Sequence, residues 1–148
     1  MGKKQEQKQI EQDKRLTIRW KSAPDEHDYL AALSYLSLIL PRRHAERVVD
    51  ALREEESCTY EASDLLRAAH LPLLPRDDPH VAQDLEKVRK GKALVPILLV
   101  GGDLLKNAPL VIADGYHRIC AAYHINENLE IPCRIVEWPP PTTAQANE

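Results

Sequence analysis

The sequence predicts an α+β protein in which a small mixed sheet packs against helices and follows an α-helical hairpin. Three observations support this fold class. Apolar residues recur at three- and four-residue spacing through residues 25–56, as in paired helices. Short runs rich in β-branched residues, at 95–100, 110–113 and 131–136, have the character of buried strands. The second run leads through an Asp-Gly pair into a segment with helical spacing, so a strand, a turn and a helix follow one another.

Length and composition limit what this chain can be. A chain of 148 residues builds a single core of moderate size. With no Phe, two Trp and five Tyr, that core must be aliphatic, and a row of aromatic side chains for stacking bases is not expected. The net charge of −3 gives no overall attraction to nucleic acids or anionic lipids.

Cysteine usage and hydropathy bear on the cellular compartment. The three cysteines, at positions 58, 120 and 133, lack CxxC spacing, which predicts reduced thiols rather than a disulfide framework. No apolar run reaches the roughly 18 residues of a membrane span, and the first residues are charged rather than apolar. We therefore expect a cytoplasmic protein with no membrane partner.

The first third of the chain has two parts, an arm and a hairpin. Residues 1–19 are dense in charge and Gln, which predicts a flexible charged arm. Residues 20–58 are predicted to form a helical hairpin extension whose second helix begins at Pro41, since proline is tolerated in a first helical turn. At the other end, we expect residues 139–148 to form a disordered, proline-rich tail.

The middle of the chain alternates short elements with turns. Residues 59–62 favour a short strand, and Ser63 is predicted to cap a brief helix. Prolines make residues 71–79 an extended loop. Asp78 precedes the last of these prolines, which predicts an N-cap with proline at the first helical position. Gly91 suits the left-handed end of that helix.

The segment Asp114–Arg118, with the sequence Asp-Gly-Tyr-His-Arg, carries the strongest functional signal. A strand that leads through Gly115 into a helix presents unpaired backbone amides and the positive end of the helix dipole, which together attract phosphate. Arg118 offers a planar fork for phosphate oxygens. Asp114 is then a base or a magnesium ligand, and His117 an acid, a base or a phosphate donor.

Two other interpretations of this segment remain open. The Asp-Gly pair is also a common turn and helix cap, with His117 and Arg118 simply exposed beyond it. Alternatively, His117, Cys120 and His124 share a helical face and could hold zinc with Cys133 or Asp114 as a fourth ligand. A small cysteine on a face that packs against a sheet is, however, more typical of a core.

Charged clusters occur outside this segment. Two are basic and are interpreted either as solvated helix faces or as a nucleic-acid patch: Arg42, Arg43 and Arg47, and Lys87, Arg89, Lys90 and Lys92. A third group lies just before the helix that begins near residue 79: Asp77, Asp78 and His80. Helix capping is its simplest role, with Asp77 or His80 within possible reach of the phosphate site.

The order of elements over residues 63–137, with the Asp-Gly-x-His-Arg turn at its centre, resembles the ParB N-terminal/sulfiredoxin superfamily. Within it, the motif looks most like that of the ParB-like kinases. The resemblance implies a domain at residues 59–138 that binds a nucleotide triphosphate, ATP or CTP, on the loop formed by Gly115, Tyr116, His117 and Arg118. The Gly-Glu-Arg-Arg signature of ParB clamps is absent, and Tyr116 stands where sulfiredoxins have cysteine.

The leading functional hypothesis is therefore a nucleotide-binding phosphoryl-transfer protein, either a kinase with a small-molecule acceptor or an NTPase. In it, Asp114 and His117 are catalytic, and Asp114 holds magnesium. Two alternatives remain. One is a nucleic-acid-binding protein or nuclease, which the net charge does not favour. The other is a noncatalytic partner module, with residues 25–56 as the surface of a homodimer.

Overall fold

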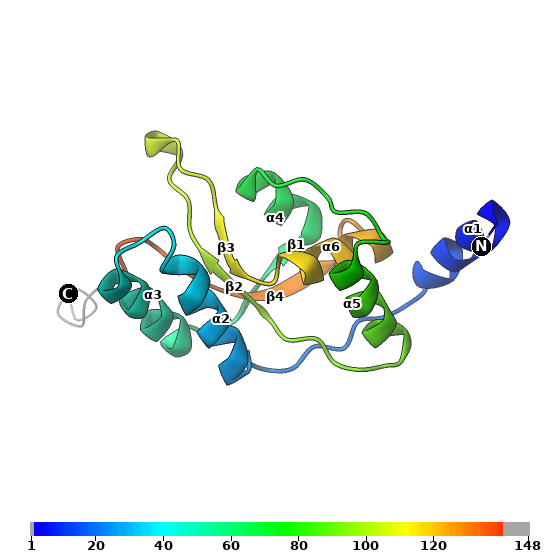
Figure 1. Cartoon of the computed structure of the whole chain (residues 1–148), viewed down its shortest axis with the longest axis horizontal. Helices are drawn as coiled ribbons and strands as arrows, with labels where there is room; N and C mark the ends of the chain where they lie inside the picture. The colour runs from blue at the N-terminus through cyan, green and yellow to red at the C-terminus, as the bar shows by residue number, and fades with distance from the viewer. Residues whose placement is uncertain (1, 141–148) are drawn as a thin grey trace.

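The computed structural model describes residues 2–140. It confirms a mixed α+β fold, with its elements in the following order (Figure 1): α1 (Lys3–Asp13), α2 (Glu26–Leu36), α3 (Arg42–Glu54), β1 (Cys58–Glu61), α4 (Ala62–Ala69), α5 (Pro79–Arg89), β2 (Ile97–Val100), the 3₁₀ helix η1 (Leu104–Lys106), β3 (Val111–Asp114), α6 (Tyr116–Ile125) and β4 (Glu130–Val136). None of these helices is long and apolar enough to cross a membrane.

The four strands form one mixed sheet in the order β1-β4-β2-β3. Strand β2 pairs parallel with β4 and antiparallel with β3, while β1 pairs antiparallel with β4. All four residues of β2 are buried, which explains why this strand is a continuous apolar run rather than an alternating one. The carboxyl end of β3 leads directly into α6, so the Asp114–Arg118 segment lies at one edge of the sheet.

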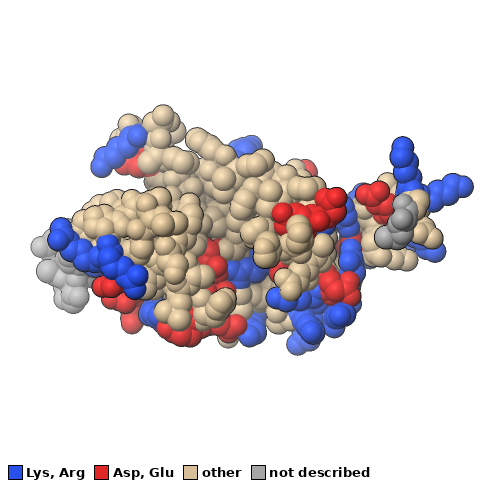
Figure 2. All heavy atoms as spheres, viewed as in Figure 1, with Lys and Arg blue, Asp and Glu red and all other residues tan. Residues whose placement is uncertain are grey.

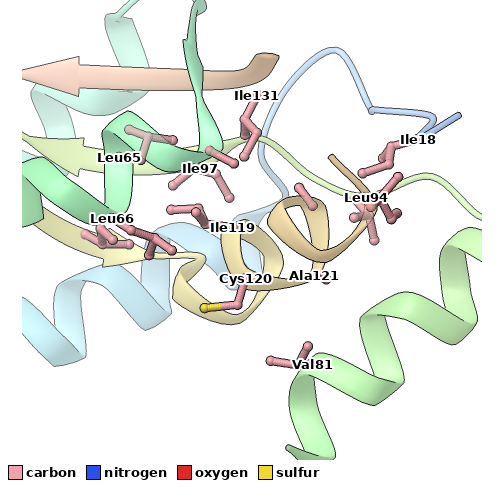
Figure 3. Packing of buried hydrophobic residues seen from close by; sticks show 14 of the residues in the cluster. Ile18, Leu65, Leu66, Val81, Leu94, Ile97, Ile119, Cys120, Ala121 and Ile131 are labelled. Carbon is pink, nitrogen blue, oxygen red and sulfur yellow. The ribbon is translucent and has the colours of Figure 1, made fainter. Parts of the chain in front are cut away.

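Helices cover both faces of the sheet. On one face, α4, α5 and α6 pack their aliphatic side chains against Ile97, Leu99 and Ile131; Figure 3 shows α6 between the sheet and α5. On the other face, α2 and α3 pack against Leu98 and Val100. Residues 20–58 are therefore not a separate extension of the domain, because they supply most of the core cluster on this face of the sheet. Sequence periodicity identified the hairpin but not the surface that it covers.

Local signals placed the two ends of α5 correctly. Asp78 caps α5, accepting hydrogen bonds from the backbone amides of His80 and Val81, and Gly91 follows the helix at a φ of +72°. The predicted cap at Ser63 is wrong, since α4 starts at Ala62 after Glu61. The chain also forms η1 between β2 and β3, which the sequence did not indicate.

The N-terminal arm differs from its prediction. Residues 3–13 form α1, which projects from one end of the body (Figure 1). The Asp13 side chain at its end is 0% exposed and accepts hydrogen bonds from Arg76 and Arg89. Ile18 is buried in the core. The description of residues 1–19 as a flexible arm is therefore wrong from Asp13 onwards, because a buried ion pair fixes the chain there. Of the predicted tail, residues 141–148 lie outside the described part.

Replacing Asp13 tests how firmly α1 is held. Burial raises the pKa of Asp13, but hydrogen bonds from Arg89 and Gln9 and the charges of Arg89 and Arg76 outweigh it, so the pKa is lowered overall. Because its pKa is lowered in the folded protein, Asp13 stabilises the fold at pH values above its ordinary pKa of 3.8. This stabilisation is lost as the pH falls below that value. We expect Asp13→Ala to cost about 1–3 kcal/mol of unfolding free energy in urea titrations and to increase hydrogen exchange in α1.

Glu11→Ala is the matched control. Glu11 lies on the same helix and forms an exposed pair with Lys14 at 3.6 Å. Its loss should change the unfolding free energy by less than about 0.5 kcal/mol. Equal stability and equal exchange in the two variants would show that the Asp13 ion pair does not hold α1.

Candidate functional site

Gly115 forms the turn between β3 and α6. Its φ of +114° lies in the left-handed region that side chains rarely adopt, and a Cβ at this position would overlap the Ile97 side chain. Glycine is therefore required here for both conformation and space. Because a single residue makes the turn, Asp114 at the end of the strand lies close to the first turn of the helix.

The first turn of α6 opens into a polar cleft. No side chain of the described residues caps this helix, so the amides of Tyr116, His117 and Arg118 have no partner within it. The cleft has a volume of about 480 Å³ and lies between α2, α5 and α6. Figure 2 shows acidic and basic side chains next to each other in the hollow between α2 and α5. A small anionic ligand fits this combination of open amides, helix dipole and space.

Arg118 lies at the floor of the cleft and is only 9% exposed. Its Nη2 donates to Asp114 Oδ2 at 2.5 Å, and its Nη1 donates to Asp28 Oδ1 at 3.4 Å and to the Val95 carbonyl at 3.2 Å. The fork that was predicted to bind phosphate is thus used within the protein. In this arrangement Arg118 fixes the geometry of the turn rather than offering a free cationic group.

Asp114 and Asp28 share this guanidinium. Burial raises the pKa of Asp114 to about 6, and although Arg118 opposes the shift, the hydrogen bond and negative charge of Asp28 add to it. Asp28 Oδ2 also accepts the backbone amide of Asp25 at 2.9 Å, so the same carboxylate caps the start of α2. The hairpin and the Asp-Gly-x-His-Arg turn therefore meet at one buried charge cluster.

One face of α5 forms another wall of the cleft. His80, Asp84 and Lys87 are spaced by four and three residues, so they share this face and all line the cleft. The imidazole rings of His80 and His117 lie 4.7 Å apart. Burial raises the pKa of the Asp84 carboxyl, although Lys87, Arg118 and both histidines act in the opposite direction. Asp84 Oδ1 is 4.0 Å from Lys87 Nζ.

Lysines from separate parts of the chain complete the cleft. Lys21 lies before α2, Lys87 on α5, and Lys92 in the segment that follows α5. Unlike Arg118, all three are exposed, although Lys21 pairs with Asp25 at 3.0 Å. The cleft thus combines cationic groups at its rim with buried or partly buried carboxylates, the partly buried His117 and the exposed His80. Such a set can neutralise phosphate charge and accept a proton.

The structure distributes the predicted site residues unequally. Asp114, Gly115, His117 and Arg118 line the cleft together. The side chain of Tyr116 does not, because its hydroxyl donates to the Pro72 carbonyl at 2.5 Å. His80 reaches the site, whereas Asp77 does not line it.

Sequence reasoning missed Asp28, Asp84 and Lys21 as site residues. Asp28 and Asp84 lie within amphipathic helices, where they resemble solvent-facing positions, and no local motif links them to Asp114. One available signal was the spacing of His80, Asp84 and Lys87, which places three polar side chains on one face of α5.

The metal interpretations receive no support from the arrangement of donors. Within residues 2–140, no three His, Cys, Asp or Glu side chains gather as metal ligands. His124 Nε2 lies 2.7 Å from the Leu74 carbonyl oxygen, and Cys120 is buried in the core, so the predicted zinc set is dispersed. The Oδ2 of Asp114, the predicted magnesium ligand, accepts a hydrogen bond from Arg118. The cleft therefore does not fit magnesium held by the protein alone.

The two basic clusters are partly neutralised. Arg42 pairs with Glu46 at 3.1 Å, and Arg47 donates to the Pro140 carbonyl at 3.2 Å. Arg89 pairs with Asp13 at 2.8 Å. These arginines are thus engaged within the protein, and over the described part of the chain they form no continuous free cationic surface for a nucleic-acid backbone.

The shared charge cluster predicts an unusual titration. The carboxyl carbon of Asp114, followed by ¹³C NMR, should titrate near pH 6, and in Asp28→Asn the titration should move to lower pH because a neighbouring negative charge is lost. Since the pKa is raised in the folded protein, this group stabilises the fold most below its ordinary value of 3.8, and the contribution falls as the pH rises through about 6. A carboxyl that titrates at or below 3.8 in the wild-type protein contradicts this picture.

Comparisons of the chain with protein-family models, curated proteins and solved structures gave no match.

Proposed function

We propose that the cleft binds a nucleotide triphosphate and supports transfer of its terminal phosphoryl group. The observation that carries this proposal is the convergence of Lys21, Lys87 and Lys92 on a cleft whose floor is the uncapped first turn of α6. Lysines and free helix amides are the groups that proteins use to hold phosphate chains. The cleft volume of about 480 Å³ suits a ligand of nucleotide size better than a polymer.

In this proposal the phosphates lie against the amides of Tyr116 and His117. The α6 dipole and the lysines balance the negative charge, and the His117 imidazole donates to a phosphate oxygen. Arg118 acts by holding Asp114 and the turn in place. Arg118 therefore positions the turn, whereas its residue type alone suggests that it binds phosphate directly.

Asp84 is the proposed general base. It lines the cleft across from Asp114 and is free of the 2.5 Å guanidinium bond that holds Asp114. As an acceptor hydroxyl or a water attacks the γ-phosphorus, a new O–P bond forms and the bond to the β–γ bridging oxygen breaks. The nucleoside diphosphate leaves with that electron pair, and the proton passes to the Asp84 carboxylate. Burial, which raises the pKa of Asp84, makes it a better proton acceptor.

Nucleotide binding is tested by calorimetry with ATP, CTP and GTP, with and without magnesium. We expect one of them to bind, and Lys87→Ala to weaken its affinity by about 10-fold through loss of a charge-assisted contact. Lys90→Ala is the control, because Lys90 lies at the end of the same helix, outside the cleft, and pairs with Glu86 at 3.7 Å. No binding by the wild-type protein, or equal losses in both variants, contradicts the proposal.

The base is tested by phosphate release from the bound triphosphate. We expect Asp84→Asn to lower the rate by at least about 100-fold while leaving nucleotide affinity nearly unchanged. Asp114→Asn should instead lower thermal stability, since the buried Arg118 loses the negative charge of one of its two carboxylate partners. An Asp84→Asn variant that releases phosphate at the wild-type rate would remove Asp84 from this role.

A further inference from the structure

A second cavity lies apart from the polar cleft and differs from it in character. It has a volume of about 530 Å³, it opens between α4 and the β2–β3 hairpin, and none of the cleft residues lines it. Its walls are mostly aliphatic, with contributions from Leu65, Leu99 and Leu110. Polar side chains, including Asp64 and His70, also line it. An apolar hollow of this size, open to water, is typical of a surface that receives another apolar group.

The tip of the β2–β3 hairpin carries two leucines that lie outside the core. Leu104 is 93% exposed and Leu105 98% exposed, although both belong to the ordered helix η1. Asp103 holds this tip closed: its carboxylate accepts the Leu105 amide at 3.0 Å, and its backbone pairs with Ala108 at 2.8 and 2.9 Å. Figure 1 shows the tip extending beyond the rest of the sheet. The fold thus holds two large apolar side chains in water.

The exposed tip and the apolar pocket adjoin each other on the same chain. Leu104 borders the pocket, but its exposure shows that it does not fill it. A two-fold axis that passes between the tip and the pocket would bring each tip to the pocket of the other copy. The contact would then be made twice and would close on itself, as in most homodimers.

Charges at the two surfaces are complementary. Lys106 lies beside the two leucines at the tip and is exposed. Asp64, at the pocket, is also exposed, and its distance to Arg67 on the same helix is 4.0 Å. In a dimer with this contact, Lys106 of one copy and Asp64 of the other are charged groups that would lie beside it. This pairing favours a second copy of the chain over an acidic partner as the occupant.

We propose that the pocket between α4 and the β2–β3 hairpin receives the Leu104–Lys106 tip of a second copy, so that two chains exchange hairpin tips across a two-fold axis. This surface differs from the 25–56 hairpin predicted from the sequence, and the proposal is independent of the chemistry in the cleft.

The oligomeric state of the full chain tests the proposal by sedimentation equilibrium over a wide range of concentrations. We expect the wild-type protein to be a dimer and the double variant Leu104→Lys, Leu105→Lys to raise the dissociation constant by at least about 100-fold. Because both side chains are exposed, these changes should leave thermal stability at low protein concentration unaltered. Leu38→Lys is the control, since Leu38 is 82% exposed and lies between α2 and α3.

Exchanging the charges at Lys106 and Asp64 tests how the tip of one copy is aligned in the pocket of the other. Lys106→Glu and Asp64→Lys should each weaken the dimer, because each places like charges opposite one another. The two changes combined in one chain should restore it, because the carboxylate introduced at the tip would then face the ammonium group introduced at the pocket of the other copy. The proposal is overturned by a wild-type monomer at every concentration or by a dimer that the tip variant leaves intact. A dimer lost only in Leu38→Lys would place the contact on the α2–α3 face, and this result would also overturn the proposal.

Discussion

The buried guanidinium of Arg118 is the contact on which the arrangement of the cleft depends. It joins three separate parts of the chain, through Asp114 at the end of β3, Asp28 on α2 and the carbonyl of Val95 before β2. A charge removed from water must be paired, and arginine can satisfy several acceptors at once because its donors lie in one plane. The hairpin and the turn are therefore fixed relative to each other by one side chain. Removing any of its partners would leave a buried charge incompletely satisfied.

The same network explains why the hairpin is part of the domain. Strand β2 needs cover on both faces, since Leu98 and Val100 point to one side and Ile97 and Leu99 to the other. Helices α2 and α3 supply the second layer, and their packing brings Asp28 to the floor of the cleft. Burial of apolar surface thus positions the hairpin, and the hydrogen bond from Arg118 to Asp28 fixes the start of α2. Residues 59–138 alone would lack Lys21 and Asp28, which line the cleft.

Sequence reasoning succeeded where the determining interactions are local. Helix α6, with its glycine turn, and the Asp78 cap of α5 depend on residues within one turn of each other, and the sequence predicted both. It failed where residues distant in the chain meet. Asp28 reaches Arg118 across 90 positions, and Asp13 reaches Arg89 across 76, so neither contact leaves a local pattern. The predicted flexible arm and the missed site carboxylates have this common cause.

The ionisation of Asp114 links the structure of the cleft to its chemistry. A carboxyl whose pKa is raised to about 6 by burial is held near its titration point at neutral pH, and Arg118 favours its charged form while Asp28 opposes it. An anion placed against the α6 amides adds negative charge close by, which would raise the pKa of Asp114 further. Anion binding and proton uptake at Asp114 are therefore coupled, and each must strengthen the other. In the proposed reaction, the hydrogen bond from Arg118 at 2.5 Å keeps Asp114 in the role of positioning the turn, and Asp84, which this guanidinium does not hold, is the proposed base.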